Sequence, residues 1–165
     1  MSTVLLSGAS GFIGSELGRS LRADGHRVIP LTRRATTGAV SWDAEAGHID
    51  SAALAGAAPE IVINLAGEPI ARRWTRSRVR RIRDSRVNGT RALSLAIAAL
   101  PAKPAAFVSG SAIGYYAAHR GDELLDERSS AGTDYLAETA DAWERAASPA
   151  SDAGIRVATI RTGMV

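Results

Sequence analysis

The feature that most constrains this chain is a glycine-rich segment, Gly8-Ala9-Ser10-Gly11-Phe12-Ile13-Gly14, which directly follows the apolar run Val4-Leu5-Leu6. Apolar residues then recur at helical spacing as far as Leu21, so the order is strand, turn, helix. Glycines let the backbone approach a phosphate, and the helix start points N–H groups and its positive dipole end at that anion. We interpret the segment as a dinucleotide-binding turn, with a tight structural turn as the alternative.

Composition limits the class of protein. The 165 residues, 45% hydrophobic and 22% charged, suit one globular domain with a substantial core. Absence of cysteine excludes disulfides and thiolate zinc sites, and the three scattered histidines predict no metal site. No apolar run approaches the roughly 18 residues of a membrane span, and we expect a cytoplasmic protein without a membrane partner.

Apolar strand-like runs alternate with helix-length segments, which predicts a parallel sheet covered on both faces. The expected strands are 4–7, 28–32, 40–42, 61–65, 106–109 and 156–160, and the expected helices are 12–23, one near Ala52, 75–100 and 134–147. Pro149 should end or kink the last helix. The predicted fold class is therefore α/β, a Rossmann-like doubly wound parallel sheet in three αβα layers.

The basic residues are concentrated in one place. The net charge is +3, and nine arginines lie between Arg72 and Arg91 with only Trp74 as an aromatic among them. Such a cluster can bind nucleic acid, but a stacking platform is missing. We interpret it as a solvated helix face and expect no nucleic-acid partner.

The end of the second strand favours one nucleotide. NAD-binding units place an acidic residue there for the ribose 2′-hydroxyl, whereas NADP sites use arginine for the extra phosphate. This chain has Thr32-Arg33-Arg34 and no acid. Guanidinium pairs with phosphate through charge-assisted bonds, so Arg33, helped by Arg34, predicts NADP(H); the alternative is a polar loop.

The segment Asn64-Leu65-Ala66-Gly67-Glu68 follows the fourth long strand. Ligands of open α/β sheets lie outside the carboxyl ends of the strands, near the point where strand order reverses. This turn should therefore border the nucleotide. Asn64 has the alternative role of satisfying backbone groups at the turn.

Several strings together resemble the NADP-dependent epimerase/dehydratase-like family of atypical extended short-chain dehydrogenases, the nucleoside-diphosphate-sugar epimerase-like proteins. They are SGASGFIG, LTRR, SWD, VINLAGEPIARRW, DSRVNGTRAL, SAIGYY, WERAASPA and the final IRTGMV. The resemblance implies that the whole chain, 1–165, is an NADP-binding Rossmann domain and that the family's C-terminal substrate subdomain is absent. It also implies cofactor contacts and a possible homodimer. The implied contacts are Gly8, Ser10, Gly11, Phe12, Ile13, Gly14, Thr32, Arg33, Leu65, Ala66, Gly67, Arg86 and Met164.

The resemblance also implies catalytic residues. Extended short-chain dehydrogenases use an Asn, a Ser or Thr, and a Tyr-x-x-x-Lys pair in which lysine lowers the tyrosine pKa and holds the nicotinamide ribose. Ser111 matches the serine and Tyr135 the tyrosine, but Thr139 replaces the lysine. A tyrosine with an ordinary pKa near 10 is ionised only about one part in a thousand at neutral pH, so the usual base is compromised. The alternative for Ser111 is an ordinary turn residue, and Tyr115 and Tyr116 are expected to pack or line the pocket.

Arg86 stands where the family's asparagine would be. It falls on the inward stripe of its helix, and a buried cation needs an anion. The resemblance implies that the cofactor is that anion; the alternative is a salt bridge to Asp84, Glu68 or a more distant acid. Trp143, at helical spacing with apolar neighbours, should pack in the core or on an oligomer surface.

Two function classes fit these observations. One is an NADP(H)-dependent oxidoreductase or epimerase acting on a carbonyl or sugar-nucleotide-like substrate, with Ser111 and Tyr135 working without the lysine. The other is a non-catalytic NADP(H)-binding domain with a regulatory or scaffold role. Because the substrate part is expected to be missing, we predict that residues 1–165 bind cofactor but turn nothing over alone.

Overall fold

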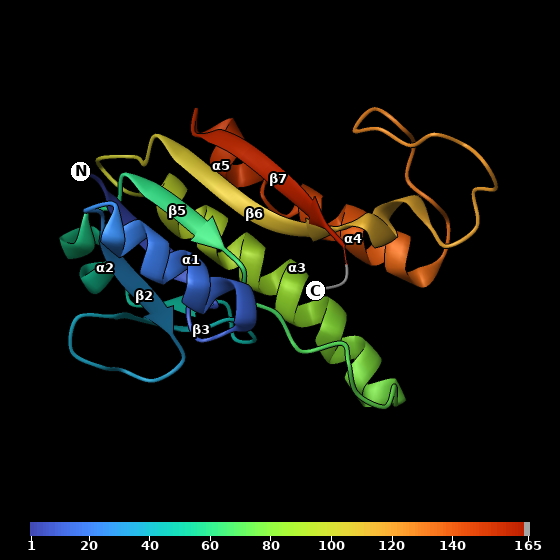
Figure 1. Cartoon of the computed structure of the whole chain (residues 1–165). Coiled ribbons are helices and arrows are strands. Elements are labelled where there is room, and N and C mark those ends of the chain that lie inside the picture. The colour runs from blue at the N-terminus through green and yellow to red at the C-terminus, as the bar shows by residue number, and fades with distance from the viewer. Residues whose placement is uncertain (164–165) are drawn as a thin grey trace.

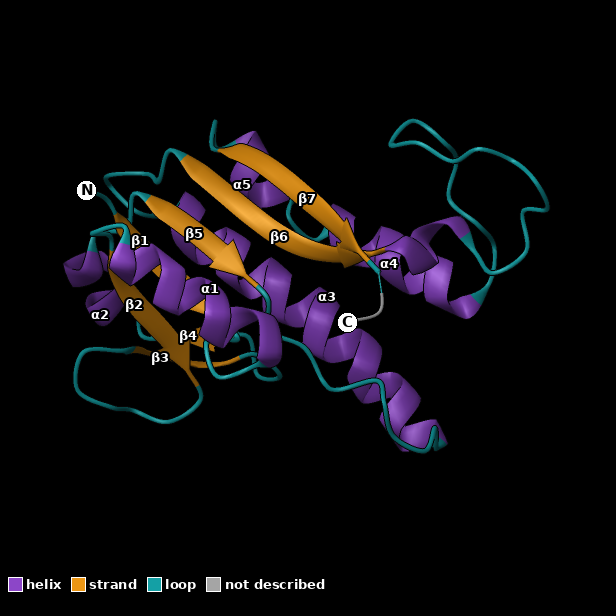
Figure 2. Cartoon of the chain, in the orientation of Figure 1, coloured by secondary structure: helices purple, strands orange, loops and turns teal. Residues whose placement is uncertain are grey.

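The computed structural model describes residues 1–163, so Met164, one of the expected cofactor contacts, lies outside the described residues. Helices and strands alternate as the sequence predicts (Figures 1 and 2). The strands are β1 (Thr3–Ser7), β2 (Arg27–Thr32), β3 (Val40–Asp43), β4 (His48–Ile49), β5 (Ile61–Asn64), β6 (Ala106–Ala112) and β7 (Arg156–Thr162). The helices are α1 (Phe12–Ala23), α2 (Ser51–Ala57), α3 (Arg76–Ala98), α4 (Tyr135–Arg145) and α5 (Ser148–Asp152), with a 3-10 turn, η1 (Ile113–Tyr116).

The sheet has the strand order β4-β3-β2-β1-β5-β6-β7. All neighbouring strands are parallel except β3 and β4, which form an antiparallel pair. Chain order runs outward from β1 in both directions, so strand order reverses between β1 and β5. The fold is therefore a Rossmann-like α/β sheet, and its switch point lies where the glycine turn leaves β1.

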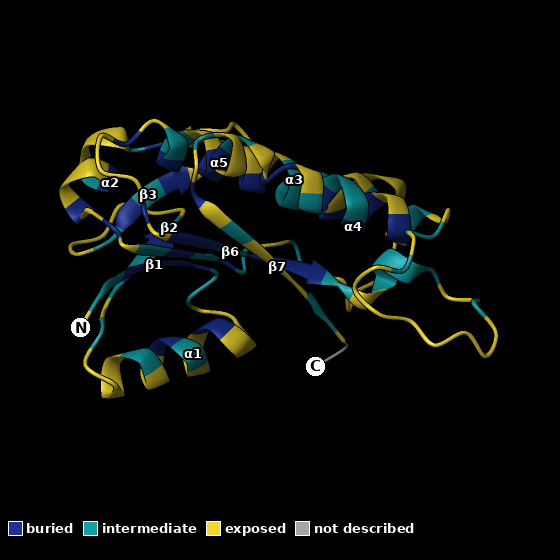
Figure 3. Cartoon of the chain, turned by 90° about the horizontal axis from the view of Figure 1, so that it is seen from above, coloured by how far each residue is buried: buried dark blue, intermediate teal, exposed yellow. Residues whose placement is uncertain are grey.

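Helices lie on both faces of the sheet, but unequally. Figure 3 shows α1 on one face and α2 to α5 on the other. Strand β7 is correspondingly exposed among the described residues, with half of the Ile160 side chain open to solvent (49%). The expectation of a sheet covered on both faces holds for β1 and fails at this edge, because α1 is the only helix on that side within residues 1–163.

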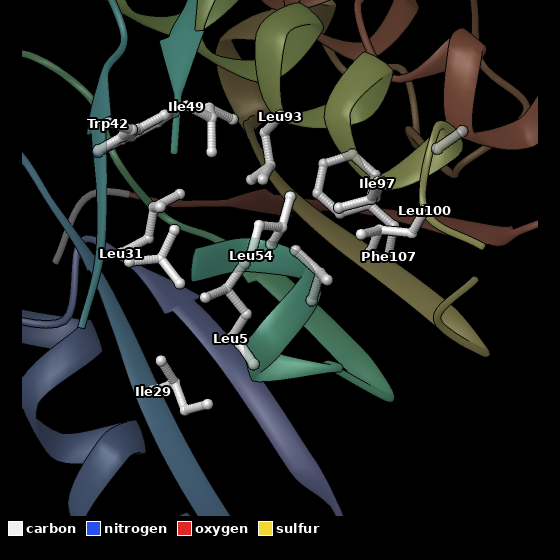
Figure 4. Packing of buried hydrophobic residues seen from close by; sticks show 14 of the residues in the cluster. Leu5, Ile29, Leu31, Trp42, Ile49, Leu54, Leu93, Ile97, Leu100 and Phe107 are labelled. Carbon is white, nitrogen blue, oxygen red and sulfur yellow. The ribbon is translucent and has the colours of Figure 1, made fainter. Parts of the chain in front are cut away.

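The core lies between the sheet and α3. Leu5 of β1 and Phe107 of β6 pack with Leu93 and Ile97 of α3, all fully buried (Figure 4). Trp42 joins this cluster from β3. Burying side chains of this size stabilises a domain by about 1.5 to 3 kcal/mol each, so α3 is fixed firmly over the switch point.

Side-chain caps explain where three helices begin. Thr75 accepts a hydrogen bond from the Arg78 backbone N–H (3.2 Å), and Asp134 accepts one from Ala137 (2.9 Å). Asp50 caps α2 in the same way. These oxygens satisfy N–H groups that have no partner inside the helix. Helix α1 begins differently, at a glycine.

Most arginines of the α3 region are exposed on the helix surface, as a solvated face requires, whereas Arg78 and Arg86 are half-buried. The exposed ones include Arg76, Arg80, Arg81, Arg83 and Arg91. No helix within the described residues is long and apolar enough to cross a bilayer. Across residues 1–163 we also find no group of three or more His, Asp or Glu side chains placed to hold a metal ion.

Candidate functional site

The turn after β1 is built from glycines that leave no room for side chains. Gly8 has a positive φ of 70°, and a Cβ atom there would lie 2.8 Å from the Leu65 carbonyl carbon. A Cβ at Gly14 would overlap the Gly8 carbonyl oxygen and lie 2.8 Å from its carbon. The Gly11 N–H donates to that same oxygen at 2.9 Å. Gly8 and Gly14 are therefore each required for steric reasons, and Gly8 brings the turn directly against the residues that follow β5.

Helix α1 begins at this turn with an open N-terminus. Its N-cap is Gly11, which has no side chain to cap the helix, and its first turn contains no acidic residue. Ser10, Phe12 and Ile13 are exposed at this end. An uncapped helix start attracts an anion through its N–H groups and dipole.

The apolar residues that recur at helical spacing in α1 are not its most buried residues. Phe12 is 83% exposed and Ile13 39%, whereas the residues buried in this helix are Gly14 and Gly18. Leu17 is half-buried. The glycines face the sheet, which lets α1 pack close to it. The apolar side chains of Phe12 and Ile13 are therefore left exposed at the start of the helix.

Hydrogen bonds of Ser7 connect the end of β1 to the turn after β5. Its hydroxyl accepts the backbone N–H groups of Leu65 (3.1 Å) and Ala66 (3.2 Å) and donates to the Asn64 side-chain oxygen (2.5 Å). The expected contacts Leu65 and Ala66 therefore border the glycine turn, and Gly67 follows them beneath the Arg86 guanidinium. Ser7 was not among the site residues expected from the sequence, although a polar residue at the end of a buried strand is a signal for such a role.

Arg33 lies at the same edge of the sheet. Ser7 pairs in register with Leu31 on one side and Asn64 on the other, so the carboxyl ends of β2, β1 and β5 are adjacent. Thr32 turns the chain there by donating to the Arg34 carbonyl oxygen (2.7 Å). Arg33 is exposed and forms no ion pair within the described residues. Its charge is available to an anion beside the turn.

Arg86 is half-buried above the turn after β5. Its Nη1 donates to the carbonyl oxygens of Glu68 and Ile82, each at 3.0 Å, and its guanidinium carbon lies 5.2 Å from the Trp143 ring centroid. A Cβ at Gly67 would lie 3.0 Å from that carbon, so the guanidinium lies over the backbone of the turn. Burial lowers the pKa of Arg86, an effect partly offset by attraction to Glu68 and Tyr135.

The alternative salt bridge for Arg86 does not form among the described residues. The carboxylate of Glu68 instead binds Arg78 at 2.8 Å and lies 3.9 Å from Arg81. Only the backbone of Glu68 contacts Arg86. A half-buried cation without a carboxylate partner is the state that an anionic ligand would stabilise.

Ser111 is buried at the end of β6 and donates to Glu144 of α4 at 2.6 Å. Glu144 also receives two bonds from Arg161 of β7, at 2.8 and 2.9 Å. Burial alone would raise the pKa of Glu144, but the hydrogen bonds from Arg161 and Ser111 hold it below its ordinary value. Arg161 stacks on Tyr115, with 3.5 Å between the guanidinium carbon and the ring centroid, and binds the Tyr116 hydroxyl at 2.8 Å.

Tyr135, the second expected catalytic residue, has different partners. Its hydroxyl donates to the Val79 carbonyl oxygen of α3 at 2.6 Å, and its ring meets Trp74 edge-on at 6.4 Å. The structure thus gives Ser111 and Tyr135 separate hydrogen-bond partners rather than one shared site. Thr139, in the lysine position, is buried, and its hydroxyl has no partner within the described residues.

A buried polar network connects these elements. Thr90 of α3 accepts hydrogen bonds from the Asn64 amide (2.8 Å) and the Trp143 indole (2.9 Å). Trp143 is 7% exposed, so the prediction of a core residue is correct. Asn64 binds side chains, not the backbone of its turn. Satisfied networks of this kind fix the relative positions of the elements that they join.

The fold and the glycine turn define a Rossmann-like nucleotide-binding domain. The chain belongs to the NAD dependent epimerase/dehydratase family, whose profile matches residues 4–162. An epimerase family protein of Mycobacterium leprae is 41% identical over 167 residues, which cover 99% of this chain and 53% of that protein. The chain spans about half the length of the curated relatives that it matches.

Two solved structures are similar. A nucleoside-diphosphate sugar epimerase from Corynebacterium glutamicum superposes with a TM-score of 0.84 at 39% identity, covering 97% of this chain and 33% of that one. The human epimerase family protein SDR39U1, solved with NADPH, gives a TM-score of 0.80 at 30% identity, covering 96% of this chain and 52% of that one. These likenesses confirm the expected family and the expected fold.

Proposed function

We propose that this chain is the NADP(H)-binding domain of an oxidoreductase or nucleoside-diphosphate-sugar epimerase acting on a carbonyl or sugar-nucleotide-like substrate. One observation carries the proposal: Arg33 directly follows β2 without an ion-pair partner in residues 1–163, at the edge of the sheet where the glycine turn leads into α1. The NADPH in the human relative and the sugar-nucleotide name of the bacterial one support it.

The residues present fit such a cofactor. Because Gly8 and Gly14 carry no side chain, the backbone at the start of α1 is open to a pyrophosphate. Arg33 would bind the 2′-phosphate, and Arg86, whose charge lacks a carboxylate partner in the described structure, would bind a further anionic or polar group. A nicotinamide dinucleotide supplies reversible two-electron oxidation and reduction when bound.

Comparative titration with NADPH and NADH tests the proposal. We expect NADPH to bind the wild type more tightly, because a charge-assisted hydrogen bond contributes about 1.5 to 3 kcal/mol. Arg33→Asp should then weaken NADPH binding at least tenfold and leave NADH binding nearly unchanged. Arg27→Asp makes the same charge change at the opposite end of β2 and should alter neither affinity. Equal affinity of the wild type for the two nucleotides would contradict the assignment.

A second function is a non-catalytic NADP(H)-binding domain with a regulatory or scaffold role. It is favoured by the neutral, buried Thr139 and by the separate partners of Ser111 and Tyr135. We propose that substrate binding depends on the half of the relatives that this chain does not match. Steady turnover of aldehydes, ketones or sugar nucleotides by residues 1–165, lost in both Ser111→Ala and Tyr135→Phe, would establish catalysis. NADPH binding without turnover would favour the second function. A cytoplasmic location, a homodimer and the absence of a nucleic-acid partner stay predictions.

A further inference from the structure

Arg161 of β7 is the centre of a cluster that joins three elements. Its Nε and Nη2 donate to the carboxylate of Glu144 in α4 at 2.8 and 2.9 Å, and its Nη1 donates to the Tyr116 hydroxyl of η1 at 2.8 Å. The guanidinium carbon also lies 3.5 Å from the centroid of the Tyr115 ring. Each nitrogen of this guanidinium therefore has a partner, and the side chain is held in one position.

The loop of residues 117–133 leaves this cluster after η1 and returns to it at α4. It projects beyond the carboxyl ends of β6 and β7 (Figures 1 and 3). Two hydrogen bonds close the neck of the loop. The Gly132 N–H donates to the Tyr115 carbonyl oxygen at 2.8 Å. The Ala118 N–H donates to the Asp134 carboxylate at 3.3 Å. The neck fixes where the loop begins and ends, but not the position of its middle.

The middle of the loop is held from outside by the Arg161 cluster. The Tyr116 hydroxyl donates to the Asp126 carbonyl oxygen at 2.8 Å. Arg161 Nη1 also reaches the Glu127 carbonyl oxygen at 3.4 Å. Burial of apolar side chains does not replace these contacts, since Leu124 is 97% exposed. Apart from the neck, the hydrogen bonds that join this loop to the rest of the described structure therefore come from Arg161 and Tyr116.

The same cluster surrounds Ser111. Strands β6 and β7 pair with Ser111 opposite Arg161, so the two side chains lie next to each other on one face of the sheet. The Ser111 hydroxyl donates to Glu144 Oε1 at 2.6 Å, and this oxygen also accepts the Arg161 Nε–H. Ser111 is only 2% exposed. A ligand can therefore reach this hydroxyl only after the side chains around it have moved.

We propose that the Glu144–Arg161 ion pair is a latch that holds the 117–133 loop and keeps Ser111 covered, and that its opening releases the loop and exposes Ser111 to ligand. The inference rests on the proposed function, in which ligand binds at the carboxyl ends of the strands. Because one oxygen of Glu144 holds both Arg161 and Ser111, the loop and the serine depend on the same carboxylate. Segments held by a few polar contacts and little apolar burial are also those that open most readily.

A thiol placed at Ser111 measures access directly. The chain contains no cysteine, so Ser111→Cys introduces a single reactive group. Its rate of reaction with iodoacetamide, an uncharged reagent, is followed without cofactor. In this background Arg161→Met should raise the rate about tenfold or more, because a hydrogen bond to a charged group shifts an equilibrium by at least that factor. Loss of a nearby positive charge by itself raises a thiol pKa and slows the reaction, so a faster reaction reports access.

Arg156→Met is the matched control, since Arg156 is an exposed arginine at the other end of β7. A solvated charge has little influence on a distant group, so the labelling rate should stay within about twofold of its starting value. Arg161→Lys keeps a positive charge for Glu144 and should restore part of the protection. Equal labelling rates in the Arg161 and Arg156 variants would overturn the proposal.

Amide hydrogen exchange shows which part of the loop moves. The Ser129 N–H donates to the Asp126 carbonyl oxygen, the same oxygen that accepts the Tyr116 hydroxyl, whereas the Gly132 N–H lies in the neck. In Arg161→Met we expect faster exchange at Ser129 and unchanged exchange at Gly132 and in β1. If that variant fails to fold, Tyr116→Phe removes the hydroxyl that joins Arg161 to the loop and should give the same pattern. Equal acceleration at all three places would mean general destabilisation and would overturn the latch.

The outcomes separate this inference from the proposed function. NADPH binding with no effect of Arg161 on labelling or exchange would overturn the latch and leave the cofactor assignment standing. An Arg161 effect in a protein that binds no nicotinamide nucleotide would support the latch and overturn the proposed function.

Discussion

Replacing Gly14 with alanine tests whether the glycine turn requires a residue without a side chain at this position. The added Cβ would overlap the Gly8 carbonyl oxygen and lie 2.8 Å from the Gly8 carbon, which is backbone and cannot rotate away. The turn or the helix start must shift, and overpacking of this kind costs about 1 to 3 kcal/mol. Gly14 does not have a positive φ, so the penalty arises from space and not from backbone strain.

Gly18→Ala is the matched control within the same helix. A Cβ there would meet the Arg22 guanidinium at 3.3 Å and the Leu6 side chain at 3.5 Å, and the end of an arginine side chain can move. Both variants gain the same helix propensity, about 1 kcal/mol. The difference between them therefore isolates the clash, and it corresponds to about 3 to 9 °C in melting temperature for a chain of this size.

Thermal unfolding and calorimetric NADPH titration measure the two effects together. We expect Gly14→Ala to melt below Gly18→Ala and to bind NADPH at least tenfold more weakly, because a displaced turn loses backbone hydrogen bonds of about 1.5 to 3 kcal/mol each to a charged phosphate. Gly18→Ala should bind like the wild type. Equal melting temperatures and equal affinities in the two variants would show that the Gly14 position tolerates a side chain.

Two further predictions concern buried polar groups. Glu144→Gln should lower the free energy of unfolding by about 3 kcal/mol at pH 7, because it leaves Arg161 without its carboxylate partner. Glu16→Gln, in an exposed ion pair, should lower it by less than about 1 kcal/mol. Because the folded pKa of Glu144 is lowered, its stabilisation is present above the unfolded value of about 4.3 and lost as pH falls below it; urea unfolding should show a weaker acid dependence in the variant. Thr90→Val should cost about 1 to 3 kcal/mol because the Asn64 amide loses its acceptor, and unchanged urea stability would contradict this.

Local patterns in the sequence predict much of the fold. Helix α1 spans Phe12–Ala23 as expected, and all six expected strands, the C-terminal one included, differ from the structure only at their ends. Strand β4 was not predicted, because two residues, His48 and Ile49, are too few to show an alternation of apolar and polar side chains. The expected helix 134–147 ends earlier, at Arg145, and Pro149 lies in the first turn of the separate helix α5, which the sequence pattern did not predict.

The interactions within the site could not be predicted in the same way. Ser7, Asn64 and Thr90 lie on three elements, and periodicity says nothing about partners so far apart in sequence. The Glu144 and Arg161 pair was missed for the same reason. Helical position predicted a buried Arg86, and the structure shows it half-buried. Only the structure shows that Glu68 offers it a carbonyl oxygen rather than a carboxylate.

The central claim is that NADP(H) binds across the turn after β1, the turn after β5 and the end of β2. Amide resonances of ¹⁵N-labelled protein, followed during titration with NADPH, test it most directly. We expect the largest shifts at 8–14, at 65–67 and at Arg33, with smaller shifts at Arg33 when NADH is used. No saturable shifts, or shifts confined to the arginines of 72–83, would contradict it.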